Sequence, residues 1–201
     1  RRTLAIWEKA QGPEHPVVAT SLHNLAELCV GGGRYAEAEP LYLRALAIRE
    51  KSPGPEHPEL AATIQALAEV YRVQRKYEQA VPLYQRALSI RENALGAEHL
   101  DVAGTLNGLA ELYRAQGKYS EAEPLCRRAL AVREKALGPE HPDVATTLYG
   151  LGALYQSEGK PAEAEPLYRR AVAIWEGIGG ASPLELGAAL GNLAEFYFAQ
   201  S

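Results

Sequence analysis

Four histidines are the side chains of this sequence best suited to metal or acid–base chemistry. His15, His57, His99 and His141 each follow a glutamate and stand 42 residues apart. A zinc ion would need their nitrogens within about 2.1 Å, whereas packed helices from successive copies of a repeat lie about 8–10 Å apart. An active site is also seldom copied once per repeat. We therefore expect these histidines to lie in loops beside helix starts, with no metal site and no catalytic role.

The two cysteines, Cys29 and Cys126, occupy positions where other copies of the repeat carry tyrosine. No neighbouring basic residue would lower the pKa of either thiol, and two cysteines do not suggest a disulfide framework. The sequence also lacks a phosphate-binding glycine loop, a nucleotide fingerprint and a Ser-His-Asp set. These observations predict buried, inert thiols, no cofactor and no enzymatic activity.

The composition indicates a globular chain without a strong electrostatic footprint. Hydrophobic residues make up 47% of the 201 residues and charged residues 23%, with a formal net charge of −4. That charge predicts no nucleic-acid partner, and no apolar run reaches the roughly 20 residues that span a membrane. The cysteine usage favours a reducing, cytoplasmic setting. The chain begins Arg-Arg and contains no methionine, so we interpret it as a piece of a longer protein.

An internal repeat organises the whole sequence. The string GPEHP begins at residues 12, 54 and 138, and a degraded copy, GAEHL, begins at residue 96, so successive copies are 42 residues apart. Within the third copy, apolar residues recur at helical spacing in two stripes separated by Gly117. The first stripe contains Leu106, Leu109 and Tyr113. Each copy is therefore predicted to be a helix–turn–helix unit, with Pro124 in the first turn of the second helix, where proline costs no hydrogen bond.

These positions match a known pattern. The tetratricopeptide spacing W-x2-L-G-x2-Y…A-x3-F is met in three copies, by Ile64, Leu67, Ala68, Tyr71, Ala80 and Tyr84, by Leu106, Leu109, Ala110, Tyr113, Ala122 and Cys126, and by Leu148, Leu151, Gly152, Tyr155, Ala164 and Tyr168. The long period with LG-x-EHP between copies resembles the kinesin light chain-like branch of the tetratricopeptide repeat family. This resemblance implies an all-α, right-handed α-solenoid of antiparallel helix pairs, with first helices lining a concave groove. It also implies a non-catalytic scaffold that binds a protein or peptide partner.

The repeat also sets the expected boundaries within a single array. Residues 1–11 align with the tail of a preceding repeat, and residues 184–201 with the first helix of a fifth. Complete helix pairs are expected at 16–53, 58–95, 100–137 and 142–179. A repeat cannot bury its apolar face alone, so we expect an exposed edge at Phe196, Tyr197 or Phe198. The two half-repeats are predicted to complete one another between molecules, in head-to-tail contacts that do not close into a ring.

The candidate binding residues lie beside the apolar stripe of the predicted first helices. Amides would bind a peptide backbone, arginines would bind acidic side chains, and Tyr149 would be an aromatic anchor. In the kinesin light chain-like resemblance, Asn107 matches a peptide-binding asparagine, and Arg72 and Arg114 match a peptide-binding arginine. The full candidate set is Gln65, Glu69, Arg72, Asn107, Glu111, Arg114, Tyr149 and Gln156.

Two alternatives stay open at this point. The charged residues of the candidate set could form a solvated face with i,i+3 ion pairs, Glu69–Arg72 and Glu111–Arg114. The array could also be a sensor or oligomerisation arm of a larger signalling or regulatory NTPase protein. Glycines within the first helices, Gly150 and Gly191 among them, favour a groove, although close helix packing would explain them equally well.

The core assignment makes a prediction about stability. Leu109→Ala is expected to lower the free energy of unfolding by about 2–5 kcal/mol, because it deletes a buried side chain and leaves a cavity. Denaturant melts of the two proteins measure the difference. A loss below about 1 kcal/mol would contradict the assignment of Leu109 to the core.

Overall fold

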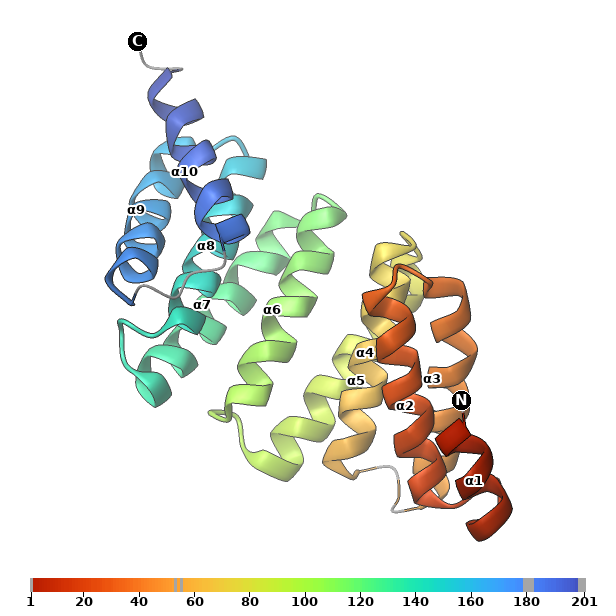
Figure 1. Cartoon of the computed structure of the whole chain (residues 1–201). Coiled ribbons are helices and arrows are strands. Elements are labelled where there is room, and N and C mark those ends of the chain that lie inside the picture. Colours follow the sequence, from red (N-terminus) through yellow and green to blue (C-terminus); the bar gives the residue numbers. More distant parts are fainter. Residues whose placement is uncertain (1, 53, 55, 179–182, 199–201) are drawn as a thin grey trace. The chain divides into compact units, whose positions relative to one another are not determined.

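The computed structural model describes residues 2–52, 54, 56–178 and 183–198, and this part of the chain forms ten α-helices and no strand (Figure 1). The predicted all-α class is confirmed. The first five helices are α1 (Arg2–Gln11), α2 (Pro16–Gly31), α3 (Tyr35–Lys51), α4 (Pro58–Val73) and α5 (Tyr77–Leu95). The other five are α6 (Leu100–Ala115), α7 (Tyr119–Leu137), α8 (Pro142–Ser157), α9 (Pro161–Ile178) and α10 (Pro183–Phe198).

The chain divides into two compact units, Arg1–Ala97 and Glu98–Ser201, which we call unit 1 and unit 2. In unit 1, α2 pairs with α3 and α4 pairs with α5, while α1 packs on α2. In unit 2, α6 pairs with α7 and α8 pairs with α9, while α10 packs on α9. The helices of each pair run antiparallel (Figure 1). The repeat boundaries given above stay predictions, and their ends at residues 1, 53, 179 and 199–201 lie outside the described residues.

The repeated histidines are the N-caps of the first helices of the pairs. The Nδ1 atom of His141 accepts a hydrogen bond of 3.1 Å from the backbone N–H of Asp143. His15, His57 and His99 accept the same bond from the residue two positions on. A cap of this kind satisfies a backbone donor that has no partner within the helix. The imidazole therefore has a structural role at each helix start, next to the proline that opens three of these helices.

The turn within each pair requires a left-handed backbone conformation. Gly33, Gly117 and Gly159 occupy it with φ values of 71°, 72° and 80°. At the equivalent position of the second pair stands Arg75, with φ of 60°. Only glycine adopts this region without steric cost, because other residues bring Cβ close to the following carbonyl oxygen. The backbone of Arg75 is therefore strained, at a turn position that glycine occupies in the other three pairs.

The prolines of the second helices lie deeper than expected. Since α7 begins at Tyr119, Pro124 is its sixth residue and falls in the second turn, so its placement in the first turn was wrong. Pro124 would lie in the first turn only if the helix began several residues later. The helix instead begins at Tyr119, directly after its N-cap Lys118 and the turn at Gly117. The carbonyl of Ser120 consequently receives no hydrogen bond from position 124. Pro124 is exposed, so water can reach this part of the helix.

The core repeats the same cluster in the two pairs of unit 1. In the first pair, Val18, Ala19 and Leu22 of α2 pack with Ala45 and Ile48 of α3. The residues one repeat further on form the next cluster, consisting of Leu60, Ala61, Ile64, Ala87 and Ile90. Small alanines between larger aliphatic residues let the helices approach closely, and burial of the aliphatic side chains stabilises each pair.

Arg75→Gly is expected to raise the free energy of unfolding by about 1 kcal/mol. The change removes roughly 1–2 kcal/mol of left-handed strain, and the greater freedom of glycine in the unfolded chain offsets part of that gain. Urea melts of the two proteins measure the difference. The matched control is Gly117→Arg, which should lower the free energy of unfolding by a similar amount. An unchanged or lower stability of Arg75→Gly would contradict the role assigned to this turn.

Candidate binding surface

The eight candidate residues lie on three first helices, in both units. Gln65, Glu69 and Arg72 lie on α4 in unit 1, as a stripe along one side of the helix. In unit 2, α6 carries Asn107, Glu111 and Arg114, and α8 carries Tyr149 and Gln156. All eight side chains are half-buried. The stripes of α6 and α8 are neighbours, since the Arg114 guanidinium donates to Ser157 Oγ at 3.2 Å.

Asn107 contacts the following helix pair. Its Nδ2 donates to Thr147 Oγ1 at 3.2 Å. The same hydroxyl accepts from Arg133 Nη1 at 2.6 Å and donates to the Asp143 carbonyl oxygen at 2.9 Å. Thr147 thus uses its one donor and both acceptor sites in a buried position. We call Asn107, Thr147 and Arg133 a polar junction, because it joins α6 and α7 to α8.

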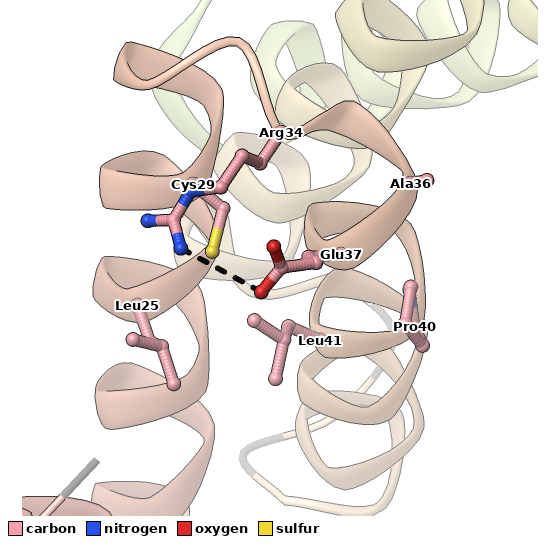
Figure 2. A pocket seen from close by; sticks show the side chains of 7 residues that line it. All are labelled: Leu25, Cys29, Arg34, Ala36, Glu37, Pro40 and Leu41. Carbon is pink, nitrogen blue, oxygen red and sulfur yellow. Dashed lines mark ion pairs between the residues drawn. The ribbon is translucent and has the colours of Figure 1, made fainter.

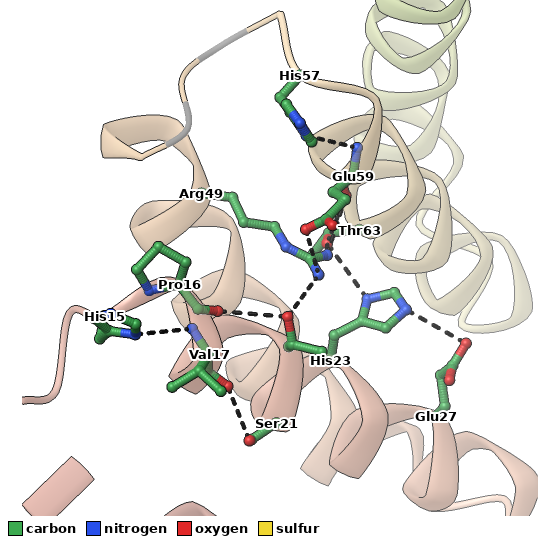
Figure 3. A network of polar contacts seen from close by, with 11 residues as sticks. His15, Pro16, Val17, Ser21, His23, Glu27, Arg49, His57, Glu59 and Thr63 are labelled. Carbon is green, nitrogen blue, oxygen red and sulfur yellow. Dashed lines mark hydrogen bonds and ion pairs between the residues drawn. The ribbon is translucent and has the colours of Figure 1, made fainter. Parts of the chain in front are cut away.

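Unit 1 contains a second polar junction, made by His23, Thr63 and Arg49 (Figure 3). His23 Nδ1 lies 3.3 Å from Thr63 Oγ1, and Arg49 donates to the same hydroxyl and, at 3.0 Å, to the Glu59 carbonyl oxygen. Arg49 is buried, with an ion pair of 3.4 Å to the Glu59 carboxylate. Burial lowers the pKa of the His23 imidazole, and the nearby Glu27 carboxylate opposes this shift without cancelling it.

Gln65 is also held by its own chain, through a hydrogen bond from Arg91. The amides expected to bind a peptide backbone therefore already make contacts within the protein. Sequence reasoning missed the partners of these amides, although the signal was present. Threonine recurs at the repeat step in the first helices and arginine in the second helices, at Thr63, Thr105 and Thr147 and at Arg49, Arg91 and Arg133.

The last junction of unit 2 replaces this polar chemistry with an aromatic contact. Tyr149 stands where the preceding copies carry His23, Gln65 and Asn107. Trp175 stands where they carry arginine, and Ala189 where they carry threonine. The ring centroids of Tyr149 and Trp175 are 6.1 Å apart, and Trp175 and Ala189 are buried. The three residues fit one another, because a buried arginine without the threonine would lack hydrogen-bond partners. Tyr149 is thereby fixed against Trp175.

The acidic and basic candidates form ion pairs along their own helices. Arg72 Nε donates to Glu69 Oε2 at 2.8 Å, and Tyr84 Oη donates to the same oxygen at 2.7 Å. Burial favours the neutral form of Glu69, but these hydrogen bonds outweigh it and hold the pKa of Glu69 below its usual value. Arg114 Nη2 likewise lies 2.8 Å from Glu111 Oε2. The two i,i+3 pairs foreseen in the sequence are confirmed.

Beside these pairs, α8 carries the uncharged residues Tyr149, Gly150 and Gln156. Gln156 Oε1 accepts a hydrogen bond of 2.7 Å from Tyr168 Oη. A Cβ added to Gly150 would only reach ordinary contact with Glu111 Oε1, at 3.8 Å, and one added to Gly191 of α10 would meet no atom within 4 Å. Close helix packing therefore does not explain Gly150. It does explain Gly152, where an added Cβ would lie 2.8 Å from the Tyr168 ring.

Unit 1 has a cavity between α2 and α3, of about 420 Å³ (Figure 2). Its walls are mainly apolar, with Leu25 and Leu41 on opposite sides and the Cys29 sulfur between them. The Arg34–Glu37 ion pair, with 3.6 Å between Nη1 and Oε2, lies at one end. None of the predicted binding residues lines this cavity.

The thiols are buried, as expected. Burial raises the pKa of the Cys126 thiol to about 12, which keeps it protonated at neutral pH. Within the described residues, no group of three or more histidine, cysteine, aspartate or glutamate side chains could hold a metal ion. No helix in the described part of the chain is long and apolar enough to cross a membrane.

Known proteins share this arrangement. The sequence matches the tetratricopeptide repeat family model over residues 1–51, 31–93, 60–125 and 101–177. BtubC (BKLC) from P. vanneervenii is 30% identical, with a TM-score of 0.75, over 84% of this chain and 68% of that one. A putative kinesin light chain of Podosopora anserina with nearly identical TPR-like repeats is also 30% identical, with a TM-score of 0.76, over 89% of this chain and 84% of that one. No curated protein sequence matches the chain.

The polar junction of unit 2 makes a prediction about stability. Thr147→Val keeps the side-chain shape but leaves Arg133 and Asn107 without their shared acceptor, so we expect a loss of about 1–3 kcal/mol in the free energy of unfolding. Thr146→Val is the matched control, because the Thr146 hydroxyl contacts only the Pro142 carbonyl oxygen, at 3.3 Å. The control should change stability by less than about 0.5 kcal/mol. Equal losses in urea melts of the two variants would contradict the junction.

Proposed function

Because the chain belongs to the tetratricopeptide repeat family, whose members generally act as protein-interaction scaffolds, we propose that unit 2 binds a segment of another protein on one face of α6 and α8. We call this surface the α6–α8 face, defined by Asn107, Glu111, Arg114, Tyr149 and Gln156. Its occupant would be an extended or short helical segment. Proteins with this fold are typically non-catalytic, and we propose no reaction for this chain.

The observation that supports this proposal most is that the side chains of the face are held in place before any partner arrives. Arg114 is fixed by Glu111 and Ser157, Gln156 by Tyr168, and Tyr149 by Trp175. Binding therefore costs little side-chain entropy, which favours recognition by a rigid surface. The hydrogen bond of Asn107 to Thr147 means that this amide mainly supports the face and is a weaker candidate for direct contact.

The chemistry of the face suits a peptide. The Gln156 amide can donate to a backbone carbonyl, since its contact with Tyr168 uses only its oxygen. The Arg114 guanidinium has a planar fork of donors that can bind a carbonyl or a carboxylate beside its pairing with Glu111. Gly150 carries no side chain that would keep a partner away from the surface of α8. Tyr149 adds apolar area with a polar tip.

Unit 1 offers a smaller version of this surface on α4. The stripe of Gln65, Glu69 and Arg72 carries the same amide and ion-pair chemistry, and Tyr84 fixes the carboxylate of its Glu69–Arg72 pair. We propose this stripe as a second contact region for a partner, supported by its likeness to the stripe of α6.

A peptide-array screen tests the proposal on the α6–α8 face. Arg114→Glu should weaken the selected peptides by about tenfold or more, because it reverses a charge in the middle of the face. Lys135→Glu is the matched control, since it makes the same charge change at a 67%-exposed side chain on α7. The control should bind as the unchanged protein does.

Equal binding by Arg114→Glu and the unchanged protein would remove the α6–α8 face from the proposal. Failure of the folded, unchanged chain to select any peptide would favour the alternative function, a sensor or oligomerisation arm of a larger signalling or regulatory NTPase protein.

A further inference from the structure

His23 of α2 lies where three helices of unit 1 meet (Figure 3). Its Nδ1 is 3.3 Å from Thr63 Oγ1 of α4, and its Nε2 is 3.4 Å from Glu27 Oε1, one turn further along α2. The ring also makes a T-shaped contact with Tyr42 of α3, with 5.4 Å between the ring centroids. The imidazole is therefore enclosed by α2, α3 and α4, and only 14% of the side chain is exposed.

The two ring nitrogens of His23 have different partners, and these partners favour one neutral form of the ring. The Glu27 carboxylate can only accept a hydrogen bond, so the single ring proton belongs on Nε2. Nδ1 is then an acceptor, and it receives the hydroxyl proton of Thr63. Because the same hydroxyl accepts a hydrogen bond from Arg49, the neutral ring completes the hydrogen bonding of this junction.

Protonation of His23 is incompatible with this arrangement. With a proton on both ring nitrogens, Nδ1 can no longer accept from Thr63, and the hydroxyl proton must turn to the Glu59 carbonyl oxygen, 3.3 Å away. The imidazolium and the Arg49 guanidinium would then both donate to one hydroxyl oxygen. Since Thr63 is fully buried, two positive charges that meet there repel one another with little screening by water.

The negative charges near the ring do not compensate for this repulsion. Arg49 is buried, whereas the Glu59 carboxylate that pairs with it at 3.4 Å is 59% exposed. Glu27 is 61% exposed, so water screens its attraction for an imidazolium. Burial of the ring lowers the pKa of His23 most, Glu27 raises it and Arg49 lowers it again, which leaves the pKa below its ordinary value.

Two further titratable groups belong to helices that pack against α2. Burial raises the pKa of Tyr42 of α3 to about 12, so this phenol is neutral where it contacts the imidazole. Glu8 of α1 pairs with Arg44 of α3 at 2.6 Å. Neither group supplies a counter-charge for an imidazolium at this junction.

The equivalent junction of unit 2 makes the same contact without a titratable group. Asn107 stands at the repeat position of His23, and its Nδ2 donates to Thr147 Oγ1 at 3.2 Å. Arg133 donates to the same hydroxyl at 2.6 Å, as Arg49 donates to Thr63 in unit 1. The two junctions share the hydroxyl and the guanidinium, but the junction of unit 1 gains a charge when its imidazole is protonated.

We propose that the polar junction of unit 1 is a pH-sensitive joint, in which protonation of His23 breaks its contact with Thr63 and loosens α2 from α4. Folded unit 1 takes up this proton at a lower pH than the unfolded chain, in which histidine titrates at about pH 6.5. The stability supplied by the neutral junction is therefore fully present above about pH 6.5. It is lost progressively as the pH falls from there to the pKa of His23 in the folded state. This inference does not depend on the proposed binding function.

The test is hydrogen exchange of the 201-residue chain at about pH 7.5 and about pH 5.5, corrected for intrinsic exchange rates. Protection of α2 and α4 should fall by about threefold to tenfold at the lower pH, because an imidazole in the unfolded chain is then about tenfold more often charged than neutral. Protection of α6 and α8 should fall less. Each unit contains two histidines that cap first helices, so titration of the caps acts on both units, and the excess loss in unit 1 belongs to His23.

Two variants separate His23 from the other histidines of unit 1. His23→Asn should remove the excess loss, because asparagine makes this contact without a charge in unit 2. His57→Asn is the matched control, since it makes the same substitution at the cap of α4, where asparagine also serves as an N-cap, and unit 1 should keep its excess loss. A loss of protection in unit 1 of the unchanged protein no greater than that in unit 2 would overturn the proposal. So would an excess loss that persists in His23→Asn, or one that disappears equally in His57→Asn.

Discussion

Burial of apolar surface between helices is shared from one pair to the next within each of the two units. In unit 1, the cluster of Val18, Leu22 and Ile48 is repeated by Leu60, Ile64 and Ile90, and a leucine of the preceding helix packs against each cluster. Because stability is then close to a sum of nearest-neighbour contacts, the contacts at each junction decide which helices stack and how firmly. The histidine caps and left-handed turns place the helices so that these junctions can form.

The junctions also explain why polar residues stand beside an apolar core. Thr147 accepts hydrogen bonds from Asn107 and Arg133 in a buried position. Every buried side-chain polar atom at this junction therefore has a partner, except the side-chain oxygen Oδ1 of Asn107. Tyr149 and Trp175 achieve the same connection by aromatic packing. The proposed binding face lies beside such junctions, so its side chains already contact the next pair. Contacts of this kind would lower the entropy cost of binding a protein partner.

Much of this could be predicted from the sequence, since helix positions and core residues follow from periodicity. Leu109 and Tyr84 are buried as their spacing indicated. The placement of Pro124 was wrong although α7 begins where the pattern indicates, at Tyr119, because the sixth residue of a helix already lies beyond its first turn. The role of Asn107 could not be predicted from the sequence alone. Its partner Thr147 is 40 residues away, and only packing of α6 on α8 shows that the two side chains meet.

Polar side chains on the first helices join one helix pair to the next, as Asn107 and Thr147 do between α6 and α8. We expect a double-mutant cycle between Asn107→Ala and Thr147→Val, measured in urea melts, to detect this contact. If the two side chains interact as described, the loss in the double mutant should differ from the sum of the single losses by about 0.5–3 kcal/mol. Losses that add to within about 0.3 kcal/mol would show that Asn107 and Thr147 are independent, and would contradict the account.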